Sequence, residues 1–144
     1  MPSHEGIMDF PVMKTPRNVN IDITSRCNLR CAYCSFFSGP GDVNDDLPLD
    51  SWLQFIAELG RHRVLNVILS GGEPFCYPDL REIIAAITAN HMRFSLLSNG
   101  TLIDDAAASF LASTRRCDHV QVSIDGAIDT THDAFRGEGN FLKA

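Results

Sequence analysis

The sequence lacks the features that mark membrane-spanning, secreted and nucleic-acid-binding proteins. Among its 144 residues, no apolar run approaches the roughly 18 residues of a transmembrane helix. The opening stretch, MPSHEGIMDFPVMKTPR, has no continuous apolar core of the kind found in signal peptides. Lysine and arginine are scattered and the net charge is −6, so no basic face is available for a nucleic acid. These absences predict a cytoplasmic protein that binds neither membrane nor nucleic acid.

Cysteine is also scarce, and its placement is uneven. Three of the five cysteines lie within CNLRCAYC, at positions 27–34. Thiols this close together form a poor disulfide framework and are more often metal ligands in a reducing compartment. The spacing C-x3-C-x2-C predicts that Cys27, Cys31 and Cys34 surround one compact object, and thiolates favour zinc or iron–sulfur clusters. Such sites usually have four ligands, so either a fourth ligand lies elsewhere in the chain or one metal corner is open.

The apolar residues follow a pattern typical of a parallel α/β protein. They make up 44% of the chain, which is enough for the core of one domain. Four short apolar, β-branched runs predict strands, and helical patterns separate them at 49–62, 77–91 and 104–114. This alternation predicts βαβ units in a parallel sheet. The strands are nearly continuously hydrophobic, which fits a sheet buried on both faces. The predicted strands are VNIDIT (19–24), VLNVILS (64–70), MRFSLLS (92–98) and HVQVSID (119–125).

The first two helical patterns define the candidate core. Asp50 or Ser51 is expected to cap the first helix. The segment SGPGDVNDDLP (38–48), which precedes it, predicts a loop whose acidic run is solvated. The residues expected to face the core are Trp52, Phe55, Ile56 and Leu59 in the first helix and Leu80, Ile83, Ile84 and Ile87 in the second.

Polar or glycine-rich stretches follow each predicted strand, where parallel α/β folds bind ligands. Cys76 follows such a stretch, whereas Cys117 precedes the fourth strand and is expected at the opposite edge of the sheet. Cys76 is therefore the candidate for a fourth thiolate, and an open metal corner is the alternative. The stretches are SRCNLRCAYC, GGEP (71–74), NG (99–100) and SIDG (123–126).

Two of these motifs together resemble the radical S-adenosylmethionine (SAM) superfamily. CxxxCxxC, with an aromatic residue before its last cysteine, is similar to the family's cluster loop, and GGEP is similar to its SAM-binding motif. In this family three cysteines hold a 4Fe–4S cluster, and SAM binds the fourth iron. The resemblance implies that Cys27, Cys31 and Cys34 are the cluster ligands and that the open corner is the active site. It covers residues 17–144 and leaves 1–16 as an N-terminal extension.

The resemblance also assigns GGEP to SAM. Gly71 and Gly72 have no side chains, so their backbone can approach the SAM ammonium closely. Pro74 stiffens the turn, and the Glu73 carboxylate is placed to fix the loop or to attract positive charge.

Four further residues are implied as SAM contacts. Tyr33 is expected beside the adenine. Asn99 and Ser123 suit the ribose hydroxyls or the SAM carboxylate, which Arg136 could hold bidentately. Each has an ordinary alternative: Asn99–Gly100 is a common turn dipeptide, a serine can cap a strand end, and an arginine can pair with an aspartate. No general base can be assigned.

Later motifs resemble the peptide- and protein-modifying subgroup, which often carries a cysteine-rich (SPASM) extension. These motifs are SNG, SIDG, HDAFRG and GNF, and LPLDSWLQFIAELGR with LSGGEPF resembles maturases of the SynChlorMet cassette. The subgroup implies radical modification of a ribosomal peptide, with a reductase, ferredoxin or flavodoxin as electron donor.

The end of the chain predicts an incomplete fold. Asn140 is a candidate N-cap followed by barely a turn of helix, and four parallel strands leave an open edge. We therefore expect about four βα units, the N-terminal part of a TIM-like partial (β/α)6 barrel. The alternatives for the whole chain are a non-catalytic iron–sulfur or zinc module, acting as an electron carrier or an inactive remnant, and a different radical SAM reaction such as sulfatase maturation or cofactor biosynthesis.

Overall fold

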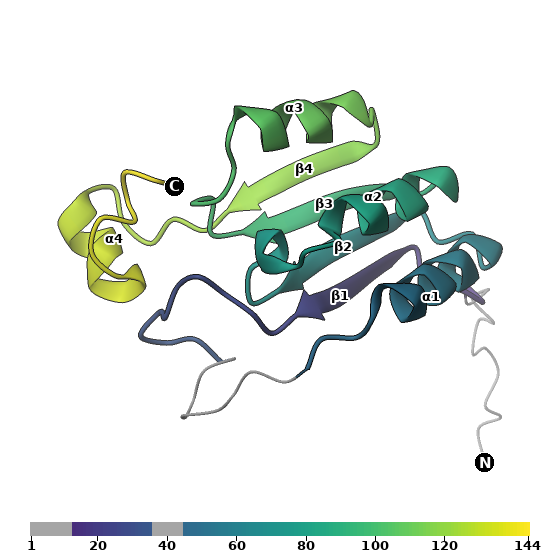
Figure 1. Ribbon diagram of the computed structural model, residues 1–144, viewed down its shortest axis with the longest axis horizontal. Coiled ribbons are helices and arrows are strands. Elements are labelled where there is room, and N and C mark those ends of the chain that lie inside the picture. Colours follow the sequence, from purple (N-terminus) through teal and green to yellow (C-terminus); the bar gives the residue numbers. More distant parts are fainter. Residues whose placement is uncertain (1–12, 36–44) are drawn as a thin grey trace, which may run out of the picture.

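Four parallel strands, adjacent in chain order, form the sheet in a computed structural model that describes residues 13–35 and 45–144 (Figure 1). A helix lies between each strand and the next, so the predicted βαβ arrangement and the α/β class are confirmed. The elements are β1 (Asn18–Thr24), α1 (Leu49–Arg61), β2 (Asn66–Gly71), η1 (Pro74–Cys76), α2 (Leu80–Ala89), β3 (Arg93–Ser98), α3 (Asp105–Ser113), β4 (Cys117–Val122) and α4 (Asp129–Arg136).

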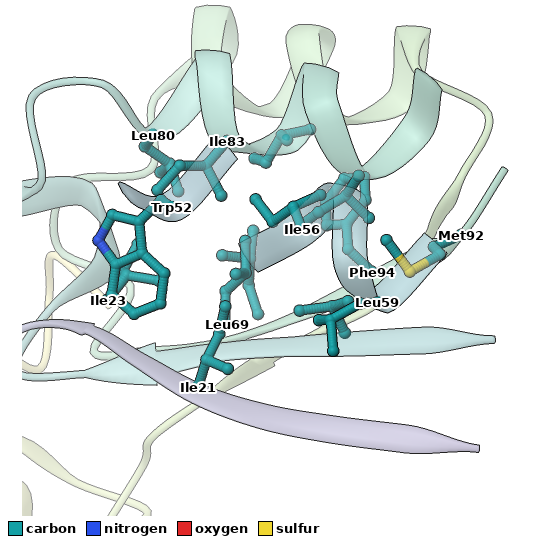
Figure 2. Close-up of a cluster of buried hydrophobic side chains, with 14 of the residues drawn as sticks. Ile21, Ile23, Trp52, Ile56, Leu59, Leu69, Leu80, Ile83, Met92 and Phe94 are labelled. Carbon is teal, nitrogen blue, oxygen red and sulfur yellow. The ribbon is translucent and has the colours of Figure 1, made fainter. Parts of the chain in front are cut away.

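The hydrophobic core lies between the sheet and helices α1, α2 and α3. Figure 2 shows Trp52 and Ile56 of α1 above Ile21 and Leu69 of the sheet. All the predicted core positions are buried except Phe55, which is 40% exposed. Its ring instead contacts the edge of Trp52, with the centroids 6.3 Å apart. Each fully buried isoleucine or leucine contributes roughly 1.5–3 kcal/mol, so this layer is the main source of stability.

The opposite face of the sheet is mainly polar and is exposed along its two edge strands, so the expectation of burial on both faces is wrong there. Side chains alternate between the two faces along each strand. The register places Asn20 beside Ile68, Ile68 beside Ser95, and Ser95 beside His119. Asn20 and His119, at the two edges of this row, are exposed, although Ser95 in its middle is buried; in the next row Ile21, Leu69 and Leu96 are buried.

The helix ends differ from the predicted ones. Pro48 is the N-cap of α1 and Asp50 lies in its first turn, so neither Asp50 nor Ser51 caps the helix. The predicted helix at 77–91 begins only at Leu80, and Pro74–Cys76 before it forms the separate turn η1. Helix α4 was not expected, since its sequence is mostly polar.

Asn140 lies between the end of α4 and the turn that follows it. Its side-chain amide donates to the carbonyl oxygens of Arg136 and Gly137, at 2.9 and 3.1 Å, and so closes the end of α4. The following residues form a turn in which Lys143 and Ala144 donate to the Asn140 carbonyl. The predicted extension at 1–16 lies mostly outside the described residues. Among the described helices, none has both the length and the apolar character that a membrane crossing requires.

Candidate functional site

A cavity of about 300 Å³ opens at the carboxyl edge of the sheet, where segments from beyond all four strands meet. Of the residues predicted to bind the cluster or SAM, only Glu73 and Pro74 lie outside its lining. The predicted residues that line it are Cys27, Cys31, Tyr33, Cys34, Gly71, Gly72, Asn99, Ser123 and Arg136.

The three clustered cysteines are free, half-buried thiols on one loop after β1. The Leu29 N–H donates to the Cys27 sulfur at 3.4 Å, and the Cys34 N–H donates to the Cys31 carbonyl at 3.1 Å. Burial raises the pKa of the Cys27 thiol, and the bond from Leu29 partly offsets this. Burial also raises the pKa of Cys31, against the attraction of Arg136. A metal that binds the Cys27 and Cys31 thiolates would displace their protons.

The other two cysteines lie outside the lining of this cavity. Cys117 begins β4 and so lies at the opposite edge of the sheet, as predicted. Cys76 closes the short helix η1, and burial raises the pKa of its thiol. The cavity lining therefore contains three thiols and no histidine, a donor set that suits an iron–sulfur cluster with one open corner. Within the described ranges, no three His, Cys, Asp or Glu side chains converge closely enough to hold a single metal ion.

The GGEP turn packs directly against the base of the cysteine loop. Gly71 has a φ of +123°, and a Cβ there would lie 2.3 Å from the Thr24 carbonyl oxygen. A Cβ on Gly72 would lie 2.3 Å from the Arg26 carbonyl oxygen. The Gly72 and Glu73 N–H groups donate to these same two carbonyls, each at 2.8 Å. The glycines are thus required for contact with the protein's own backbone, whatever they do for a ligand.

Glu73 fixes this turn to the end of β3. Its carboxylate is fully buried and accepts hydrogen bonds from the Asn99 N–H at 2.7 Å, the Ser98 hydroxyl at 2.9 Å and the Phe75 N–H at 3.2 Å. Burial raises the pKa of Glu73, and these three bonds oppose the effect. These contacts fit the prediction that the Glu73 carboxylate fixes the GGEP loop. Ser98 was missed by the sequence analysis, although it directly precedes the NG dipeptide.

Arg136 lies in a hydrogen-bonded cluster with Asp125 and Tyr33. Its Nε pairs with Asp125 Oδ2, and its Nη2 donates to the Tyr33 hydroxyl at 2.9 Å. The Tyr33 hydroxyl donates to the same Asp125 oxygen at 2.5 Å, and this bond, with Arg136, lowers the pKa of Asp125. Arg136 is therefore paired with an aspartate, which is the ordinary alternative given for it above. The proposed contacts of Tyr33 and Arg136 with SAM remain predictions.

Helix α4 supports the cysteine loop from the outside. The Ala32 N–H donates to the Phe135 carbonyl at 2.8 Å, and the rings of Tyr33 and Phe135 meet edge to face, 5.9 Å apart. Buried His132 accepts from the Asp125 N–H at 3.3 Å through Nδ1. Sequence reasoning missed α4 because its contribution depends on contacts to residues about 100 positions away.

The acidic loop before α1 also contributes, contrary to the expectation that it is merely solvated. The side chain of Asp46 is only 7% exposed, and it accepts from the Thr24 hydroxyl at 2.8–2.9 Å and from the Ser25 N–H at 3.1 Å. It also pairs with Arg26 at 3.1 Å. Asp46 therefore holds the chain where it leaves β1. The part of this loop at 38–44 lies outside the described residues.

Comparisons with known proteins agree on one family. The model of the Radical SAM superfamily matches residues 21–143. Mycofactocin maturase MftC of Mycobacterium ulcerans (strain Agy99) is 37% identical over 123 residues, covering 85% of this chain and 33% of that protein. The AdoMet-dependent heme synthase of Methanosarcina barkeri (strain Fusaro / DSM 804) is 37% identical over 122 residues, covering 85% of this chain and 35% of that protein.

A solved structure has the same fold. SuiB of Streptococcus suis, bound to S-adenosylmethionine, superimposes with a TM-score of 0.75 and 21% identity, covering 88% of this chain and 29% of that one. The described strands and helices therefore correspond to part of a radical SAM barrel. The chain spans about a third of the length of the curated relatives it matches.

Proposed function

We infer that this chain, which belongs to the radical SAM superfamily, binds a 4Fe–4S cluster and SAM. The proposed site is the cavity at the carboxyl edge of its sheet. The observation that carries the proposal is the meeting of three thiols, the Gly71–Gly72 turn and the Arg136 guanidinium around one cavity. When bound, such a cluster supplies one electron to SAM, which breaks into methionine and a 5′-deoxyadenosyl radical.

The chain's own residues would hold and orient these groups. Cys27, Cys31 and Cys34 supply three soft ligands, and the cavity lining offers no fourth thiol. Arg136 has a side chain only 12% exposed and is held at the cavity wall by Asp125, where its charge would attract the SAM carboxylate. Tyr33 is 56% exposed and lines the same cavity, so its ring is available to an adenine.

We further propose that the substrate is a ribosomally made peptide. The later motifs resemble the peptide- and protein-modifying subgroup, and one relative, 37% identical, is a mycofactocin maturase. SuiB, which has the same fold, has been solved with a precursor peptide. A reductase, ferredoxin or flavodoxin would supply the electron. Cofactor biosynthesis is the second candidate, since a heme synthase has the same 37% identity to this chain as the mycofactocin maturase.

The test is anaerobic cluster reconstitution followed by an assay for 5′-deoxyadenosine, with dithionite as reductant. We expect about four irons per chain and SAM cleavage in the wild type, and neither in a C27A/C31A/C34A variant. Cys117→Ala is the matched control, because it removes a half-buried thiol at the other edge of the sheet. Stoichiometric zinc in place of iron would overturn the proposal. A four-iron cluster without cleavage would favour the non-catalytic iron–sulfur module.

A further inference from the structure

The side chain of Asn99 is hydrogen-bonded to the cysteine loop. The residue is only 6% exposed, although it lines the cavity. Its Nδ2 donates to the Asn28 Oδ1 at 2.9 Å and contacts the Cys27 sulfur at 3.8 Å. Its Oδ1 accepts from the Thr101 N–H at 3.0 Å and from the Thr101 hydroxyl at 2.7 Å. An amide has two N–H donors and two acceptor lone pairs, so all four are engaged within the described part of the chain.

These bonds determine which way the amide faces. The Thr101 backbone N–H can only donate, so the atom 3.0 Å from it must be the amide oxygen. Asn28 closes a ring, because its own Nδ2 donates to the Thr101 hydroxyl at 2.8 Å. Three side chains therefore hold one another in a single orientation, and rings of this kind reinforce each bond. The Asn99 backbone is fixed as well, by the bond from its N–H to Glu73.

We propose that Asn99 is a positioning residue for the cluster: its second amide N–H donates to the Cys27 sulfur and thereby raises the cluster's reduction potential. The inference rests on the proposed function, because it requires that Cys27 is a cluster ligand. The Leu29 N–H is a second donor to the same sulfur, at 3.4 Å. Each one-electron reduction adds negative charge to the cluster and its sulfur ligands. Hydrogen bonds to those sulfurs therefore stabilise the reduced state more than the oxidised state.

The test measures the midpoint potential of the reconstituted cluster in the 144-residue chain without SAM, by EPR or absorbance during titration with dithionite. Asn99→Leu removes the donor at similar volume. A hydrogen bond to a charged group changes an equilibrium by about tenfold, so the reduced-to-oxidised ratio at a fixed potential should fall about tenfold, a negative shift of about 59 mV for one electron. Asn90→Leu is the control, since its amide donates to the Ala86 carbonyl at the end of α2.

A second variant keeps the test decisive if N99L does not retain iron. Thr101→Val removes the hydroxyl that orients the Asn99 amide but leaves the donor in place, so we expect a smaller shift in the same direction. An unshifted potential in N99L would overturn this inference and leave the proposed function standing. If N99L binds no iron, an unshifted potential in T101V would have the same meaning. So would an effect of N99L on SAM affinity without a change in potential. A wild type without a four-iron cluster would overturn the proposed function together with this inference.

Discussion

At the scale of single residues, Gly72 decides how closely the GGEP turn approaches the cysteine loop. A methyl group at this position would lie 2.3 Å from the Arg26 carbonyl oxygen, 2.7 Å from its carbon and 2.9 Å from the Ser25 carbonyl oxygen. All three atoms belong to backbone just before Cys27, which cannot move without moving the loop. The residue therefore acts on the cysteines through packing, before any ligand is bound.

We expect Gly72→Ala to lower the free energy of unfolding by about 1–3 kcal/mol through overpacking. We also expect it to reduce the iron bound per chain after reconstitution, because the cysteine loop must shift. Urea unfolding and iron analysis measure the two effects. Gly139→Ala is a useful comparison: its Cβ would meet nothing within 4 Å, although its φ of +75° costs about 1–2 kcal/mol. Wild-type iron content in G72A would contradict the prediction.

At the scale of elements, α4 and the turn after it form one unit through Asp133. Its carboxylate accepts from the Gly139 N–H at 2.7 Å and from the Phe141 N–H at 2.8 Å. Phe141 in turn lies against buried His132, with ring centroids 5.6 Å apart. Desolvation alone would raise the pKa of Asp133, but the bonds from Phe141 and Gly139 outweigh it and lower the pKa. The turn is therefore tied to the helix by an ionised carboxylate.

The stability of this turn should depend on pH. A lowered pKa means that the folded state favours ionised Asp133, so the stabilisation is full above the ordinary pKa of an aspartate and is lost as pH falls through the lowered pKa. Amide hydrogen exchange at Gly139 and Phe141, corrected for intrinsic rates, measures it. Asp133→Asn should lower protection at neutral pH and remove the dependence. Asp129→Asn, which alters the first turn of α4, should leave both amides unchanged. Equal protection in D133N and wild type would contradict the prediction.

At the scale of the whole molecule, the core and the site occupy different places. The buried aliphatic residues lie between the sheet and α1–α3, whereas the cysteines lie on the loop after β1. Figure 1 shows this loop leaving the end of β1, away from helices α2 and α3. None of the three clustered cysteines belongs to the core cluster. The scaffold that positions the thiols is therefore stabilised without them.

We accordingly expect the metal-free C27A/C31A/C34A variant to fold. Partly exposed substitutions cost little, so the loss of unfolding free energy should not exceed about 2 kcal/mol. Ile84→Ala, in the fully buried layer of α2, should cost about 2–5 kcal/mol. Urea unfolding followed by circular dichroism in metal-free buffer compares the two. An unfolded cysteine variant would show that the metal, rather than the core, stabilises this fold.

Most of the elements, and the residue types at the site, follow from local patterns in the sequence. Strand and helix periodicity are local properties, so β1 to β4, the first three helices and the buried positions of α2 followed from apolar spacing. The cysteine spacing and GGEP are also local, and parallel topology brings the segments after all four strands to one edge of the sheet.

The contacts of each polar side chain, in contrast, depend on the folded arrangement of distant segments. Asn99 meets Asn28 across 71 positions, and Arg136 meets Tyr33 across 103. The Asn140 side chain bonds to the end of α4, and the Asp46 carboxylate bonds to Thr24 and Ser25 at the end of β1. Periodicity carries no information about such partners, because hydrogen bonds depend on the positions and directions of individual atoms, which exist only once the chain has folded.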